Sequence, residues 1–218
     1  LREAKDGKYL LIFDKTPFYA ESGGQVGDQG KIYSDSFEAK VLDVQKQKDI
    51  FIHTVEFEKG IAEENKTYKL EVDIVKRLDT AKNHTATHLL HKALREVVGT
   101  HVQQAGSLVD SEKETGIEEA KKLGAMMLFG DKYGDVVRVV DVPGFSTELC
   151  GGTHIDNIGK IGLFKIVSEG GIAAGVRRIE AKTGYGAYLV EKEEADILNN
   201  IEKKLKATNI NLVEKVEK

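Results

Sequence analysis

Two motifs are the most informative features of this sequence: His84-Thr-Ala-Thr-His88 and, further along the chain, Cys150-Gly-Gly-Thr-His154. Each motif places two metal-ligand side chains four residues apart, and on a helix that spacing puts both on one face, about a turn apart. Three imidazoles and one thiolate suit a tetrahedral Zn²⁺ ion better than calcium or magnesium, which prefer oxygen ligands. The two motifs are therefore expected to converge on one ion, with ligand atoms within about 4 Å of one another, and so to tie two distant parts of the chain together.

Other metal and histidine interpretations can be weighed against the same residues. A zincin protease carries His-Glu-x-x-His, in which the glutamate is the general base. Here Thr85, Ala86 and Thr87 stand between the histidines, so that base is missing. A zinc finger would need closer cysteine spacings, and the chain has a single cysteine. A lone histidine is more often a hydrogen-bonded helix residue, but four ligands in two matched pairs favour a metal site.

Composition and charge restrict the class of protein. The 218 residues are enough for one large or two small domains, and 31% of them are charged, which is typical of a globular protein. No apolar stretch is long enough to span a bilayer, and no secretory signal is visible. A single cysteine fits a reducing, cytoplasmic setting. The net charge of -4 argues against non-specific nucleic-acid binding but permits a local basic patch that meets one RNA end.

The periodicity of apolar residues predicts an α+β fold in three parts. Short strand signals separated by glycines predict a small glycine-rich β-barrel over residues 1–77. A helical stripe that begins at Leu78 and ends at Gly99, followed by mixed strands and a short helix, predicts an α/β zinc-binding core over residues 78–184. A charged helix with a narrow apolar seam is expected over residues 185–218. Strands are expected at 9–13, 37–44, 50–55, 68–74, 102–109, 136–142, 162–167 and 176–181. The short helix is expected at 117–123.

Five segments in order resemble the editing domain of alanyl-tRNA synthetase and the related free-standing AlaX-type deacylases. Together they span nearly the whole chain, which begins at Leu1 without an initiator methionine and is interpreted as a fragment of a longer ligase that lacks the aminoacylation domain. The segments are Thr16-Pro-Phe-Tyr-Ala-Glu-Ser-Gly-Gly-Gln25, His84–His88, Val102-Gln-Gln-Ala-Gly-Ser107, Cys150–His154 and Ala174-Gly-Val-Arg-Arg-Ile-Glu180.

The resemblance implies hydrolytic editing of Ser-tRNA(Ala) and Gly-tRNA(Ala) by an aminoacyl-tRNA deacylase that meets the acceptor end of the tRNA. It implies that His84, His88, Cys150 and His154 hold Zn²⁺, and that the polar residues Gln104, Thr16 and Gln25 take part in catalysis. It also implies that Gly23 and Gly24 line the amino-acid pocket. Any oligomerisation of the parent enzyme would use the region after the C-terminal helix, and no membrane is involved.

Several of these roles have a plain structural alternative. The glycines of the 16–25 segment also suit an ordinary β-turn, where they serve backbone geometry alone. Arg177 and Arg178 either contact phosphates of the RNA, which guanidinium groups bind bidentately, or form a solvated strand edge. One departure from the family is visible between Val109 and Gly116, where a longer segment with a strand and an acidic, aromatic stretch is usual.

Two rival functions stay open at this point. Four protein ligands already close a tetrahedral zinc site, which on chemistry alone favours a non-catalytic tRNA-binding module with structural zinc. Against that rival stand Gln104 and the 16–25 segment, polar groups that a structural site does not need. Within the enzymes, a threonyl-tRNA editing domain shares the metal motif but should lack the 16–25 and 174–180 segments. A free-standing AlaX-type deacylase is the nearest alternative to a synthetase fragment.

Overall fold

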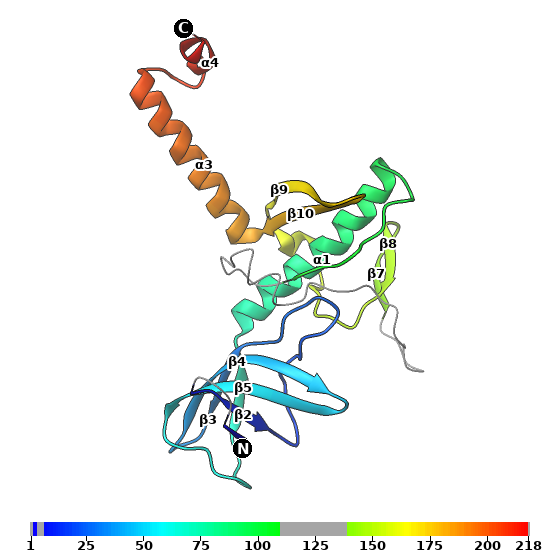
Figure 1. Ribbon diagram of the computed structural model, residues 1–218, viewed down its shortest axis with the longest axis vertical. Coiled ribbons are helices and arrows are strands. Elements are labelled where there is room, and N and C mark those ends of the chain that lie inside the picture. The colour runs from blue at the N-terminus through cyan, green and yellow to red at the C-terminus, as the bar shows by residue number, and fades with distance from the viewer. Residues whose placement is uncertain (1, 4–6, 110–138, 218) are drawn as a thin grey trace. The chain divides into compact units, whose positions relative to one another are not determined.

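The computed structural model describes residues 2–3, 7–109 and 139–217, and it forms two compact units, Leu1–Ile158 and Gly159–Lys218. Sheets and few helices make up both units, so the predicted α+β class is confirmed (Figure 1). The three-part division into residues 1–77, 78–184 and 185–218 stays a prediction, and the helix expected at 117–123 lies outside the described residues. The elements are β1 (Arg2–Glu3), β2 (Tyr9–Ile12), β3 (Gly30–Tyr33), β4 (Glu38–Gln47), β5 (Ile50–Lys59), β6 (Lys69–Val72), α1 (Ile74–Val97), β7 (Val139–Val142), β8 (Ser146–Leu149), the 3₁₀ helix η1 (Ile158–Ile161), β9 (Phe164–Ala173), β10 (Val176–Thr183), α3 (Gly184–Leu205) and α4 (Leu212–Val216).

The first unit contains a six-stranded antiparallel sheet in the order β1-β2-β5-β4-β3-β6. That order is open among the described residues, so closure of the sheet into a barrel stays a prediction. Strand β3 was not expected, because it is four residues long and only Ile32 in it is buried. It nevertheless joins β4 to β6 and so completes the sheet.

A bulge in β4 decides which side chains form the core of this sheet. Ala39 and Val41 point inward, and simple alternation would then bury Asp43. The register shifts between Val41 and Asp43, so Val44 is buried instead. Each such fully buried aliphatic side chain contributes about 1.5–3 kcal/mol relative to its exposed state.

The loop over residues 13–29, between β2 and β3, is fastened to the sheet and to α1. Phe18 is buried in the core, and the Glu21 amide donates to Val44 O over 2.8 Å, at the bulge. Asp28 accepts hydrogen bonds from Tyr19 N at 2.6 Å and from the guanidinium of Arg77 on α1. The second half of the loop is therefore held to β4 at Glu21 and to α1 at Asp28.

Helix α1 starts four residues before the predicted Leu78. Asp73 caps it, because its carboxylate accepts from Lys76 N at 3.1 Å. It ends at Val97, just before Gly99 as expected. None of the described helices has the length and apolar character needed to cross a membrane.

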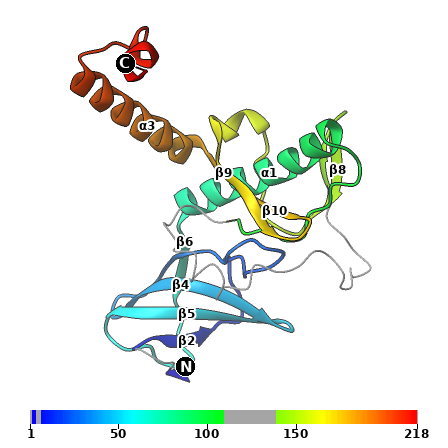
Figure 2. The same ribbon diagram turned by 45° about the horizontal axis from the view of Figure 1, so that its top comes forward.

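The second unit contains the antiparallel hairpin β9–β10, from which α3 follows directly, and ends with the short helix α4 (Figure 2). The first turn of α3 buries Gly186 and Ala187, and Lys165 on β9 pairs with Glu191 and Glu194 of the helix. These elements agree with the strands and the charged helix predicted there. The strand predicted over residues 102–109 is wrong: the segment is irregular, apart from one isolated bridge at Val109.

The ion pair between Arg77 and Asp28 gives a test of the loop attachment. Arg77→Met keeps most of the apolar stem but leaves the Asp28 carboxylate, whose side chain is 5% exposed, without its charged partner. Removing one partner of a buried pair costs about 3 kcal/mol, and urea unfolding should show a loss of that size. Lys31→Met is the control, because the pair of Lys31 with Glu38 lies at the surface and its loss should leave the free energy of unfolding nearly unchanged. Equal effects of the two substitutions would contradict the assignment.

Candidate metal centre

Helix α1 supplies two of the four predicted ligands. His84 is 5% exposed and His88 is half-buried, and their rings stack with centroids 5.1 Å apart. Thr85 and Ala86 are buried as well, so α1 is covered around much of its circumference at this motif. The four-residue spacing thus places both imidazoles side by side, as predicted.

The segment after β8 supplies the other two ligands. Cys150 is buried, and His154 is held against α1 through Thr85. The Thr85 hydroxyl oxygen lies 3.1 Å from His154 Nδ1 and accepts from the Ile155 amide at 3.4 Å. Thr85, inside the first motif, therefore anchors the end of the second.

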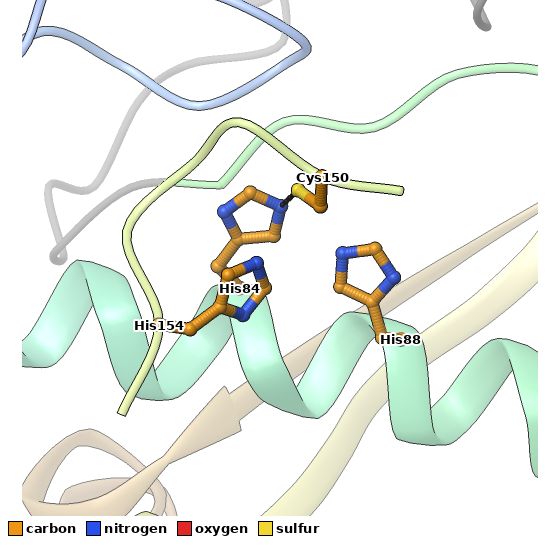
Figure 3. A group of neighbouring side chains, drawn as sticks. All are labelled: His84, His88, Cys150 and His154. Atoms are coloured by element: carbon orange, nitrogen blue, oxygen red, sulfur yellow. Dashed lines mark hydrogen bonds between the residues drawn. The ribbon is translucent and has the colours of Figure 1, made fainter. Parts of the chain in front are cut away.

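All four side chains turn toward one space, the histidines of α1 from one side and the 150–154 segment from the other (Figure 3). One candidate ligand atom from each residue lies within 4.8 Å of all the others, and Cys150 Sγ is 3.3 Å from His84 Nε2. Tetrahedral zinc with bonds of about 2.0–2.3 Å needs ligand atoms roughly 3.3–3.6 Å apart. The structure brings the predicted residues together, over a slightly wider space than the expected 4 Å.

The protonation of the cluster suits a soft divalent metal. Burial opposes the Cys150 thiolate, but interactions with the neighbouring His154, His84 and His88 outweigh it and lower the thiol pKa to about 3. Burial lowers the pKa of His154, which favours its neutral form. Its Nε2 is buried and has no hydrogen-bond partner among the described residues, which would be costly unless a ligand occupies that direction. A thiolate and neutral imidazoles are the forms that bind zinc.

Gln25 of the glycine-rich loop reaches this cluster directly. Its side-chain oxygen lies 2.7 Å from His84 Nδ1 and accepts from the Thr153 amide at 2.8 Å. Its side-chain nitrogen donates to the Thr153 hydroxyl at 2.9 Å. Gln25 therefore contacts both metal motifs, although its role in the reaction stays a prediction.

Thr16, Gly23 and Gly24 occupy different places in the same loop. Thr16 bonds through its hydroxyl to His53 Nε2 on β5 at 2.8 Å and accepts from the Phe18 amide within the loop, so its contacts are with the sheet and the loop itself. Gly24 has a positive φ, and a Cβ there would lie 2.4 Å from Ser107 O. That close approach puts the loop beside the segment that carries Gln104. Gly23 also has a positive φ, but a Cβ there would meet no atom within 4 Å.

The remaining predicted residues lie on other elements. Gln104 is half-buried in the irregular segment between α1 and Val109. Arg177 is exposed on β10 and pairs with Glu169 on β9, its Nη2 donating at 2.6 Å. Arg178 is half-buried on the same strand. Both interpretations of this arginine pair, as an RNA contact and as a strand edge, stay open.

Sequence reasoning missed three residues that shape the cluster. Thr85 and Thr153 orient ligands or Gln25, and Gly152 lies against His84, where a Cβ would come within 2.1 Å of Cε1. A signal was present, because each motif places a threonine next to a ligand. A hydroxyl between two ligands can hydrogen-bond to a ligand and orient it, and a glycine leaves room for a ligand ring.

Comparison with known proteins finds two family models on this chain. Residues 137–180 match "Threonyl and Alanyl tRNA synthetase second additional domain", and residues 2–76 match "tRNA synthetases class II (A)". Alanine--tRNA ligase of Fusobacterium nucleatum is 79% identical over 100% of this chain and 29% of its own length. The ligases of Alkaliphilus metalliredigens and Listeria monocytogenes are 46% and 47% identical, each over 95% of this chain and 28% of their own length.

The chain thus spans less than a third of the curated relatives it matches. The alignment with the Fusobacterium ligase covers 254 positions and the chain has 218 residues, so at least 36 positions of that relative have no counterpart here.

Two adjacent glycines allow a matched test of the cluster. Gly152→Ala would place a methyl group 2.1 Å from the His84 ring and 2.7 Å from Gln25 Oε1, whereas a Cβ at Gly151 meets nothing within 4 Å. Displacing a ligand and its supporting residue should weaken zinc binding by roughly tenfold to a hundredfold, measured by competition with a chromophoric chelator. Gly151→Ala should bind zinc as the unchanged protein does. If Gly152→Ala also binds zinc normally, these four residues are not the site.

Proposed function

The chain belongs to the alanyl-tRNA synthetase family, and we propose that it is the part of such an enzyme that hydrolyses mischarged tRNA(Ala). The bond cleaved is the ester between serine or glycine and the terminal ribose. Water adds to the ester carbonyl, the carbon–oxygen bond to the ribose breaks, and the ribose hydroxyl leaves with a proton. The observation that carries this proposal is the convergence of His84, His88, Cys150 and His154 beside a polar loop.

Selectivity gives a physical reason for a second, hydrolytic site. A synthetic pocket sized for alanine cannot exclude glycine, which is smaller, and rejects serine poorly, since serine adds only a hydroxyl. Differences of that kind are worth about 1–3 kcal/mol, which is too little for accurate translation. A separate deacylase removes the errors that the first pocket lets through.

The four converging side chains would hold a zinc ion, which, when bound, supplies Lewis acidity for the carbonyl or the attacking water. The chain's own residues set the surroundings. Gln25 and Thr85 orient His84 and His154, and Gly24 brings the loop against Ser107. Gln104, three residues before Ser107, would then offer its amide to the amino acid.

The nucleic-acid partner of this site would be the acceptor end of tRNA(Ala). Arg177 and Arg178 on β10 are the candidates for phosphate contacts, and Glu169 would have to release Arg177 for such a contact. The place of action would be the cytoplasm, where tRNA is charged, with no membrane involved. Assembly of the parent enzyme would use the region after α3.

One observation favours a second candidate, a tRNA-binding module whose zinc is purely structural. The cluster offers four protein ligands, and a tetrahedral site with four protein ligands has no open position. In that case the polar loop would support the ligands and contribute nothing to hydrolysis. The two candidates differ in one measurable property, the release of amino acid.

The deciding experiment is a deacylation assay with the 218-residue chain and zinc. Ser-tRNA(Ala) and Gly-tRNA(Ala) should lose their amino acid well above the rate in buffer, while Ala-tRNA(Ala) should not. Binding of the tRNA in a gel-shift assay without any release of amino acid would favour the structural-zinc candidate. No binding and no release would overturn both.

Gln104 and its neighbour allow a test of the pocket. Gln104→Ala removes a half-buried amide, and loss of one hydrogen bond to substrate should lower kcat/KM for Ser-tRNA(Ala) by about tenfold. Gln103→Ala is the control, because Gln103 is exposed in the same segment. Thermal unfolding should be nearly unchanged in both variants. Full activity in Gln104→Ala would mean that this residue lies outside the pocket.

A further inference from the structure

Gln25 lies outside the two metal motifs but contacts both of them. Its polar side chain is almost fully buried. Its exposed fraction is 1%, and every polar atom of its amide has a partner. Burying an amide is costly unless its hydrogen bonds are made, so these contacts fix the side chain firmly. Its partners, His84 and Thr153, belong to the protein and are not reactants in the proposed hydrolysis.

The orientation of the Gln25 amide follows from the backbone. The amide nitrogen of Thr153 can only donate, so the Gln25 atom 2.8 Å from it must be the oxygen. That same oxygen lies 2.7 Å from His84 Nδ1. Because an oxygen of this kind can only accept, Nδ1 must carry a proton.

The tautomer of His84 follows in turn. A neutral imidazole has one proton, and with that proton on Nδ1 the lone pair is on Nε2. Nε2 is the nitrogen that faces Cys150, 3.3 Å from its sulfur. The hydrogen bond from His84 to Gln25 therefore leaves the correct nitrogen available as a metal ligand.

The backbone around Gln25 is fixed just as closely. The backbone N–H of Gln25 donates to Ser22 O at 3.0 Å, and its backbone carbonyl accepts from Ser22 N at 3.1 Å. On either side of it, Gly24 O accepts from the Val109 amide at 2.7 Å, and the Val26 amide donates to Val109 O at 3.1 Å. The loop is thus clamped to the end of the segment that carries Gln104.

We propose that Gln25 is a positioning residue that sets the tautomer of His84 and couples metal binding to the order of residues 22–28. Zinc bound at Nε2 makes the Nδ1 proton a better donor, which strengthens the bond to Gln25 and so holds the loop more firmly. By linkage, an ordered loop raises the affinity for zinc by the same factor. The proposal rests on the metal site of the proposed function but does not require hydrolysis.

Three variants of the 218-residue chain separate this role from a merely structural one. Gln25→Met has a similar length but no acceptor for His84, whereas Gln25→Glu keeps an oxygen at that place. Gln29→Met is the matched control: Gln29 lies in the same loop, but its side-chain oxygen accepts from Lys76 on α1 at 2.5 Å rather than from a histidine of the cluster. Zinc affinity is measured by chelator competition. The order of residues 22–28 is measured by amide hydrogen exchange with and without zinc.

Gln25→Met should weaken zinc binding by roughly tenfold to a hundredfold, as loss of a partner behind a histidine ligand does. Gln25→Glu should stay within about threefold of the unchanged protein, and Gln29→Met should bind zinc normally. Zinc should slow exchange across residues 22–28 in the unchanged protein and in Gln29→Met but not in Gln25→Met. Equal zinc affinity in all variants would overturn the proposal, whatever their stability.

The exchange measurement on the unchanged protein keeps the test valid even if Gln25→Met does not fold. If zinc leaves the exchange of residues 22–28 unaltered, the coupling does not exist. Failure of the proposed function is distinguished by the deacylation assay, which can be negative while Gln25 still governs zinc affinity. A chain that binds no zinc at all would overturn both.

Discussion

The hydrogen bond between His84 Nδ1 and Gln25 Oε1 is the contact through which three distant segments meet. It joins α1 to the 13–29 loop, and through Thr153 the same amide reaches the segment after β8. Without it, two polar side chains that are each at most 5% exposed would lose partners together. Because the desolvation of such groups has already been incurred on folding, the arrangement is strongly preferred over any in which the loop lies elsewhere.

That contact depends on features of the sheet that lie well away from the cluster. The bulge between Val41 and Asp43 exposes Val44 O to the loop, and Gly27 passes so close that a Cβ would lie 2.7 Å from that oxygen. Asp28 and Arg77 fix the loop to the first turn of α1, two turns before His84. The loop is thus bonded to the sheet at Val44 and to the helix at Arg77, and these two attachments together determine where Gln25 lies.

The sequence predicted the parts of the molecule that local spacing controls. Side-chain type and periodicity predict the convergence of the four candidate ligands, the strands near 9, 50 and 176, and the end of α1 before Gly99. The bulge, strand β3 and the irregular course of 102–109 depend on pairing with distant residues, which one sequence does not display. For the same reason Gln25 and His84 could each be singled out as site residues, but the contact between them, across 59 residues, could not be predicted.

The donor set also bears on the choice between a catalytic and a structural metal. One thiolate and three imidazoles that bind a metal in their neutral form would contribute a single negative charge, so a divalent ion held by them would leave the centre with a net positive charge. A site of four cysteine thiolates would be net negative. The neutral amide of Gln25 adds no charge, and the buried carboxylate of the same loop, Asp28, is already paired with Arg77. In such surroundings the ester carbonyl oxygen of the proposed substrate, which gains negative charge as water adds, would be stabilised rather than repelled. This electrostatic balance is what the proposed hydrolysis would need, and the number of ligands by itself does not decide between the two candidate functions.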